Sequence, residues 1–159
     1  VLFSGTIDSN IRYGKPEITD AQVKEAAEVA QATEFIDTKP EKYESPVSQG
    51  GTNVSGGQKQ RLSIARAIAK DPEIFIFDDS FSALDFKTDS QLRKALKEYT
   101  KDATTVIVAQ RISTILGADQ IIVLDDGHMA GIGTHKELMA NCEVYQQIAR
   151  SQLSEEELA

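Results

Sequence analysis

Apolar residues recur at helical spacing in two stretches of the first half of the chain, and they predict helices over 19–33 and from Ser55 to about residue 71. The residues expected to face inward are Val23, Ala26, Ala27 and Ala30 in the first helix and Leu62, Ala65, Ile68 and Ala69 in the second. Both helices begin with a capping box, in which a Thr or Ser is followed three residues later by Gln. The intervening residues 38–53 combine Pro, Gly and polar types without a period, which indicates a long loop.

Short unbroken apolar runs follow, and they predict strands over 74–77, 105–109, 120–124 and 129–132. We expect the first two strands to be buried on both faces, because such runs are typical of parallel strands with helices on either side. A helix over about 87–99 joins these two strands, and its inward residues are expected to be Leu92, Ala95 and Leu96. This alternation predicts an α/β fold with a mainly parallel sheet flanked by helices, in which ligand chemistry belongs at the carboxyl ends of the strands.

The C-terminal part of the chain carries local start and stop signals. A short helix near 112–116 leads into the third strand, and the Asp-Gly pair at 126–127 predicts a hairpin turn between the third strand and the fourth. Thr134 and Glu137 form a third capping box, which starts the C-terminal helices. The acidic end over 154–159 is expected to fray.

Composition and charge narrow the range of functions. Hydrophobic residues make up 40% of the 159 residues and charged residues 26%, as in soluble globular domains. The apolar runs are far shorter than the roughly 20 residues that span a bilayer. Asp and Glu number 25 against 17 Lys and Arg, and the net charge of −8 disfavours duplex nucleic acid as the main partner. The single cysteine, Cys142, is expected to be a buried or half-exposed thiol in a C-terminal helix.

The sequence Ser55-Gly56-Gly57, at the start of the second predicted helix, is the sharpest candidate for binding chemistry. A Ser cap followed by two glycines leaves the first backbone N–H groups of a helix uncovered. There the helix dipole favours an anion and no Cβ blocks its approach, so a phosphate group fits. Taken alone, the same three residues also suit a plain helix cap and turn.

The longer string SGGQKQRLSIARAI resembles the signature motif of ATP-binding cassette (ABC) ATPases. The positions that carry this resemblance are Ser55, Gly56, Gly57, Gln58, Gln60 and Arg61. IFIFDD resembles the Walker B strand of that family, SALD its D-loop and VIVAQRIST its switch segment. With LFSGTI near the start and GTHKEL near the end, the similarity covers nearly the whole chain. It implies a P-loop NTPase-like fold with part of a helical subdomain and the signature helix (about 15–71), a core with Walker B, D-loop and switch (about 72–134) and C-terminal helices (about 135–159).

The resemblance also implies cofactors and a partner. In that family the signature closes over the γ-phosphate of an ATP held by the partner subunit, so function implies a head-to-tail dimer of nucleotide-binding domains. The implied nucleotide-binding residues are Ser55, Gly56, Gly57 and Gln58, together with Asp85 of the D-loop. Asp78 matches the Walker B aspartate that holds magnesium, usually through water, which suits a hard cation that keeps part of its hydration. ATP and Mg²⁺ are therefore the implied cofactors.

Two catalytic positions depart from the family pattern. Asp79 stands where active members usually have the Glu that orients or deprotonates the attacking water, and Asp is one methylene shorter. Gln110 stands where the family usually has a His that contacts the γ-phosphate, and an amide cannot carry a proton at neutral pH. We expect Asp79 and Gln110 to support hydrolysis poorly. His135 follows the hairpin in a capping box, so it is interpreted as a surface residue of a first helical turn and not as the missing His.

A third departure is that the chain contains no G-x-x-x-x-G-K-[ST] sequence, the loop that wraps the α- and β-phosphates. The family places this Walker A loop before LFSGTI. The chain is therefore interpreted as the C-terminal part of a nucleotide-binding domain without its N-terminal portion, and these residues alone are expected to be inactive in ATP hydrolysis.

The leading hypothesis is the hydrolysis-impaired half of a heterodimeric ABC exporter at the cytoplasmic face of the cell membrane. Its signature would complete the ATP site of a non-identical partner, and Gln49 is a candidate contact with the coupling helices of the transmembrane domain. Two alternatives stay open. One is a homodimeric exporter in which Asp79 still acts as the base. The other is a soluble ABC ATPase acting on DNA, which the acidic charge and the close spacing of the motifs disfavour, so no nucleic acid partner is expected.

Overall fold

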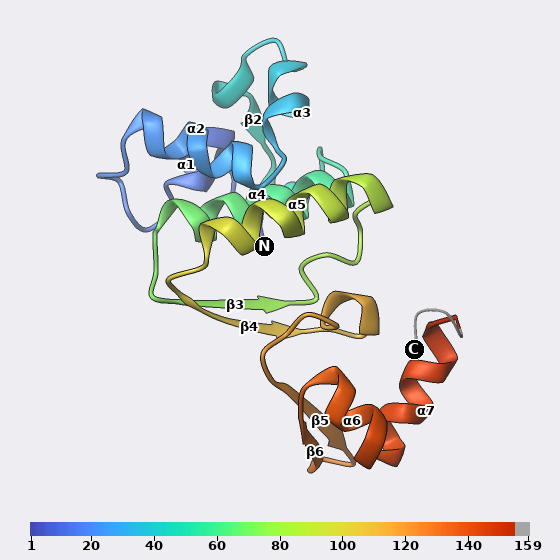
Figure 1. The fold of residues 1–159 in the computed structure, drawn as a ribbon. Helices are drawn as coiled ribbons and strands as arrows, with labels where there is room; N and C mark the ends of the chain where they lie inside the picture. Colours follow the sequence, from blue (N-terminus) through green and yellow to red (C-terminus); the bar gives the residue numbers. More distant parts are fainter. Residues whose placement is uncertain (155–159) are drawn as a thin grey trace. The chain divides into compact units, whose positions relative to one another are not determined.

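The computed structural model describes residues 1–154 and divides them into two units, Val1–Val106 and a second unit from Ile107 onward. Both helices and strands are present, which confirms the predicted α/β class (Figure 1). The first unit contains β1 (Gly5–Thr6), α1 (Ile7–Ile11), α2 (Asp20–Val29), α3 (Thr33–Asp37), η1 (Lys42–Glu44), β2 (Pro46–Val47), η2 (Gln49–Gly51), α4 (Gly56–Ala69), β3 (Ile74–Asp78) and α5 (Phe86–Tyr99). Strand β4 (Thr104–Val108) crosses the boundary, and η3 (Ile112–Thr114), β5 (Ile121–Asp125), β6 (His128–Gly133), α6 (His135–Asn141) and α7 (Glu143–Gln152) follow.

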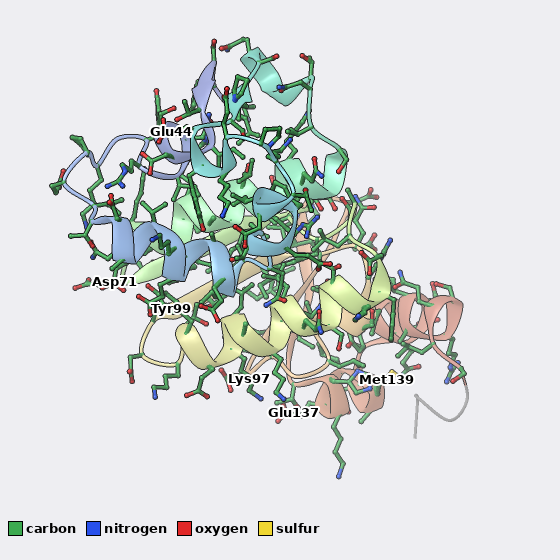
Figure 2. All side chains as sticks on the ribbon, turned by 90° about the horizontal axis from the view of Figure 1, so that it is seen from above. Glu44, Asp71, Lys97, Tyr99, Glu137 and Met139 are labelled. Atoms are coloured by element: carbon green, nitrogen blue, oxygen red, sulfur yellow. The ribbon has the colours of Figure 1, made fainter. Side chains whose placement is uncertain are left out.

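Helix α4 is central to the first unit. Its predicted inward residues are all buried, and so are those of the first predicted helix, which confirms both apolar faces. Helix α2 packs on α4, and Tyr99 at the end of α5 donates its hydroxyl to the Ile68 carbonyl near the end of α4, at 3.3 Å (Figure 2). All these side chains belong to one hydrophobic cluster or pack against it.

The first predicted helix is shorter than its pattern indicates. Helix α2 ends at Val29, and the chain turns at Gln31, whose φ of 56° lies in the left-handed region, before α3 begins at Thr33. Arg61 of α4 donates to the Gln31 carbonyl at 2.8 Å, so a tertiary contact stabilises this break. The apolar period continues through the break because Ala30 and Ala32 are both buried.

The predicted loop over 38–53 contains ordered elements. Its β2 pairs with β1 in an antiparallel register of Gly5 with Val47 and Thr6 with Pro46, between the short helices η1 and η2. A strand of only two residues is too short to show an alternation of apolar and polar residues. The sequence pattern therefore indicated a loop. Val47 and Ser45 in this segment are buried.

The expectation that the first two strands are buried on both faces is wrong for the residues that the structure describes. Phe75 and Phe77 of β3 lie in the core, whereas Ile74 and Ile76 are 59% and 70% exposed. The cause is that α4 and α5 lie on the same side of β3 (Figure 1). Every residue of β4 is exposed. Strand β4 is the hydrogen-bonded neighbour of β3 and runs in the same direction, as in the parallel sheet that the sequence predicts.

The second unit is built on an antiparallel hairpin. Strands β5 and β6 pair from Ile121 with Gly133 to Asp125 with His128, with a bulge at Val123/Leu124, so the predicted hairpin at 126–127 is confirmed. Helices α6 and α7 complete a cluster formed by Ile112, Ile121, Val123, Leu138, Cys142, Tyr145 and Ala149. Cys142 is a buried free thiol, as expected, but it lies at the junction of α6 and α7 and not inside a helix.

Three further predictions concern membrane-spanning helices, the C-terminal end and the division of the chain into parts. Within residues 1–154 no helix has both the length and the hydropathy needed to cross a membrane. The predicted fraying of 154–159 falls almost entirely on 155–159, which lie outside the described residues. The division at about 15–71, 72–134 and 135–159 stays a prediction.

Candidate functional site

An open pocket lies where the N-terminus of α4 meets the segment before α5. Its volume is about 410 Å³, and we call it the glycine pocket; it is lined by Ser55, Gly56, Gly57, Arg61, Ala83, Leu84, Asp85 and Thr88. Four of the five residues predicted to bind nucleotide line it, and the fifth, Gln58, belongs to the same helical turn. All of these residues belong to the first unit.

The first turn of α4 has the geometry predicted from its sequence. The Ser55 hydroxyl accepts from the Gln58 N–H at 3.2 Å, and the Gln58 side-chain oxygen accepts from the Ser55 N–H at 3.2 Å, so the capping box is complete. Helix geometry leaves the N–H groups of Gly56 and Gly57 without intrahelical partners. These donors lie at the positive end of the helix dipole, which favours an anionic ligand.

Arg61 adds a positive charge to the glycine pocket. Its side chain donates to the Gly57 carbonyl at 3.3 Å and lies 4.8 Å from the centre of the Phe35 ring. Burial lowers the pKa of Arg61, while the charge of Asp85 opposes this shift. Because a guanidinium remains protonated in proteins, Arg61 supplies a fixed cation beside the two glycines. The pocket therefore suits the terminal oxygens of a phosphate chain.

Asp85 is the N-cap of α5. One carboxylate oxygen accepts from the Thr88 N–H at 3.0 Å and the other from the Thr88 hydroxyl at 2.7 Å. These hydrogen bonds lower the pKa of Asp85. The next residue, Phe86, is 90% exposed. The described contacts of Asp85 are those of a cap, and its predicted role in nucleotide binding stays a prediction.

The predicted catalytic carboxylates follow β3 directly. Asp78 is the last residue of the strand and is exposed, and Asp79 has a φ of 46°, in the left-handed region. The Ser82 hydroxyl donates to a carboxylate oxygen of Asp79 at 3.1 Å. The side-chain nitrogen of Gln60 donates to the Asp79 carbonyl at 3.0 Å. In the sequence, Gln60 counts among the signature positions but has no predicted role. Its fixed place in the motif was the one sign in the sequence that it has a function.

Asp78 fits a magnesium ion as one ligand of a set. Within residues 1–154 no cluster of three or more His, Cys, Asp or Glu could hold a metal alone. Mg²⁺ typically keeps several waters and takes only one or two protein carboxylates, with phosphate oxygens as further ligands. An exposed carboxylate at the end of a strand matches that donor set.

Gln110 lies in the second unit, just after β4, and is exposed. Its backbone carbonyl accepts from the side chain of Gln152 at 2.8 Å, and the same side chain accepts from the Ile112 N–H at 2.9 Å. Helix α7 thus holds the main chain of the predicted switch segment. His135 opens α6, as predicted, but it is half-buried and not a plain surface residue. Its Nδ1 lies 2.8 Å from the Tyr145 hydroxyl of α7, which accounts for the burial.

Gln49 is exposed in η2, between α3 and α4. Its side-chain oxygen accepts from the Ser4 N–H at 3.1 Å, which ties η2 to the start of the chain. Its role as a contact with a membrane domain stays a prediction.

Comparison with known proteins supports the same reading of these motifs. A family model described as "ABC transporter" matches residues 3–82. The chain is 47% identical over 154 residues to an uncharacterized ABC transporter ATP-binding protein of Mycobacterium tuberculosis, covering 95% of this chain and 26% of that protein. It is also 47% identical over 148 residues to a Staphylococcus aureus protein provisionally named a multidrug export ATP-binding/permease protein, covering 93% of this chain and 26% of that protein.

A solved structure gives the same result in three dimensions. The chain aligns with a bacterial Atm1-family ABC exporter with ATP bound at a TM-score of 0.93 and 38% identity. This alignment covers 98% of the chain and 27% of the exporter chain. The chain thus spans about a quarter of the length of the curated relatives that it matches.

Proposed function

Because the chain belongs to the ABC transporter family, we propose that it is part of the ATP-driven motor of an exporter and that it contributes to two unequal ATP sites. The observation that carries this proposal is the contrast between the glycine pocket and the two predicted catalytic positions. Four signature residues, Ser55, Gly56, Gly57 and Arg61, line the open glycine pocket, and Gln58 completes the cap of the same helix. The turn after β3 carries Asp79 in place of the usual Glu, and the switch segment carries Gln110 in place of the usual His.

The glycine pocket serves the ATP of a second nucleotide-binding domain. Its uncovered N–H groups at Gly56 and Gly57 and the guanidinium of Arg61 supply donors and positive charge to phosphate oxygens that the partner presents. Nothing in this pocket departs from the family pattern, so the partner's site is completed normally. An identical partner would carry the same weakened catalytic residues, so an intact signature would complete an impaired site. We therefore infer a non-identical partner.

The chain's own site holds ATP and hydrolyses it slowly. Bound Mg²⁺ would neutralise phosphate charge there, and Asp78 would hold the ion through its hydration water. Asp79 would orient the attacking water from a shorter side chain, and a positioned base contributes typically about 10² to 10⁴ in rate. Gln110 can donate a hydrogen bond but cannot carry a proton, so the two substitutions weaken the same step.

The remaining parts of the proposal concern location and coupling. A motor domain of an exporter works at the cytoplasmic face of the cell membrane, beside the coupling helices of a transmembrane domain. Gln49 is exposed, so it is available for such a contact. The Ser4 N–H, which donates to its side-chain oxygen, holds it in place. Salt-sensitive DNA binding by the full-length protein would favour the soluble DNA-acting alternative instead.

The first experiment measures steady-state ATP turnover by the full-length subunit alone, with ATP binding confirmed on the same sample. Binding without turnover is expected, because the chain's own site lacks an effective base. Turnover comparable with that of ordinary exporters would contradict the impaired site and support the homodimeric alternative.

The second experiment restores the family residues in the full-length dimer. Asp79→Glu combined with Gln110→His should raise ATP turnover, by at least about tenfold at this chain's own site. The matched control is Asp71→Glu with Gln147→His, because Asp71 also has a left-handed φ, 48°, and both positions are exposed. Unchanged turnover in the restored protein, with ATP still bound, would refute the proposal.

A further inference from the structure

The side chain of Gln60 connects α4 to the residues that follow β3. Its nitrogen Nε2 donates to the Asp79 carbonyl at 3.0 Å and to the Ser82 hydroxyl oxygen at 3.0 Å. Its oxygen Oε1 accepts from the Ala83 N–H at 2.9 Å. One amide thus makes three hydrogen bonds to a segment about 20 residues further along the chain.

These bonds fix the orientation of the amide. The Ala83 backbone N–H can only donate, so the atom that faces it must be the oxygen of Gln60. The NH₂ group then necessarily faces Ser82 and the Asp79 carbonyl, and the Ser82 oxygen accepts one of its protons.

This orientation directs the single proton of the Ser82 hydroxyl. Asp79 offers two acceptors, a carboxylate oxygen at 3.1 Å and its backbone carbonyl at 3.3 Å. The carbonyl already accepts from Gln60, and a bond to a charged carboxylate is the stronger of the two. The hydroxyl therefore donates to the carboxylate, which fixes the Asp79 side chain toward residue 82.

We propose that Gln60 and Ser82 are positioning residues that hold the Asp79 carboxylate against its own turn and so restrain hydrolysis at this chain's ATP site. This inference rests on the proposed function, in which Asp79 orients the attacking water. The carboxylate has to turn away from Ser82 to meet that water, and the short Asp side chain has little reach to do both. This restraint lowers the rate of hydrolysis further, beyond the reduction that follows from having Asp in place of the longer Glu.

Two substitutions release the carboxylate by different routes. Ser82→Ala removes the hydroxyl. Gln60→Glu keeps an acceptor for the Ala83 N–H but replaces the NH₂ donor with a carboxylate oxygen, which competes with Asp79 for the Ser82 proton. Ser82→Thr keeps the hydroxyl and serves as the conservative variant. The matched controls are Ser90→Ala and Gln91→Glu, two exposed positions of α5.

The experiment uses the full-length transporter with a partner whose own catalytic carboxylate has been removed, so that turnover comes from this chain's site. We expect Ser82→Ala and Gln60→Glu each to raise kcat by about tenfold, the effect of losing one hydrogen bond to a charged group, with KM for ATP changed less than about twofold. Ser82→Thr and both controls should match the wild-type kcat. Adding Asp79→Asn should abolish the gain, because the released group is its carboxylate.

Failure of this inference is separable from failure of the proposed function. Fast turnover by the wild-type site would contradict the impaired site itself. Slow wild-type turnover that neither Ser82→Ala nor Gln60→Glu raises would leave the impaired site standing and overturn the restraint. A gain that persists with Asp79→Asn would also overturn it, since another group would then be responsible.

Discussion

Two neighbouring glycines in the first turn of α4 approach the same residue of the next segment in different ways. A Cβ on Gly57 would lie 3.0 Å from the backbone carbonyl oxygen of Ala83, whereas one on Gly56 would lie 3.3 Å from the Ala83 side chain. Backbone cannot move without shifting Leu84 and Asp85, which line the same pocket. Gly57 is therefore required by close approach, and Gly56 is less constrained.

This difference gives a prediction for the two alanine variants. Gly57→Ala should lower the free energy of unfolding by about 1–3 kcal/mol through overpacking. Gly56→Ala should be closer to neutral, because the gain in helix propensity, up to about 1 kcal/mol, offsets a milder contact. Urea unfolding of the two proteins measures both values. Equal destabilisation would show that the Ala83 carbonyl does not discriminate between the two sites.

The residues of the candidate site differ in how visible they were in the sequence. Ser55 and Gln58 form a local motif, so their cap could be predicted from spacing alone. The bonds of Gln60 join positions 19 to 23 residues apart and depend on how α4 packs, which no local pattern records. The left-handed backbone of Asp79 was equally hidden, since Asp is common in ordinary turns.

At the scale of elements, Arg66 joins α4 to the first residues of the chain. Its guanidinium donates to the carbonyl and side-chain oxygens of Asn10, both at 2.7 Å, and to the Val1 carbonyl at 2.8 Å. It also lies over the stacked rings of Phe3 and Tyr13, at 5.1 and 5.4 Å from their centres. One half-buried side chain thus holds the segment that leads into α1.

Arg66→Ala should destabilise the protein by about 2–4 kcal/mol, since it removes the hydrogen bonds to Asn10 and Val1 and the contacts with two rings. Arg66→Lys should recover less than half of that loss, because a single ammonium cannot reproduce the planar fork. Thermal unfolding of both variants, with the exposed Arg150→Ala as the control, measures the effect. Full recovery by Lys would show that charge alone is sufficient.

The presence of helices and strands was predicted more reliably than what covers each of their faces. The caps at Thr19, Ser55 and Thr134 are all present, because a capping box is a contact between residues three apart. An unbroken apolar run such as that of β3 records that both faces are apolar, but not what covers each face. The burial of β3 was therefore predicted on two faces and observed on one.

At the scale of the whole molecule, the first unit leaves apolar side chains of β3 in contact with solvent. Ile74 and Ile76 are both more than half exposed, on the face opposite Phe75 and Phe77. Exposed apolar surface next to a strand favours self-association. This feature decides how the 159-residue chain should behave when prepared alone.

Ile76→Lys should reduce self-association of the 159-residue chain while leaving its unfolding transition within about 0.5 kcal/mol of the wild type, because the site is exposed. Sedimentation velocity over a range of concentrations measures the association. Gln91→Lys on α5 is the control, since it adds a positive charge without removing apolar surface. Equal improvement by both variants would assign the effect to net charge and not to β3.

The exposure of Phe86 makes this position suitable for a fluorescent reporter. Its ring is 90% exposed and directly follows Asp85, a residue that lines the glycine pocket, and the chain contains no Trp. Phe86→Trp would therefore install one indole in this chain, in water, beside the pocket that we propose receives a partner's phosphate. Indole emission shifts to the blue when water is displaced, so this position offers an optical signal for the proposed closing of two subunits, read without any added dye.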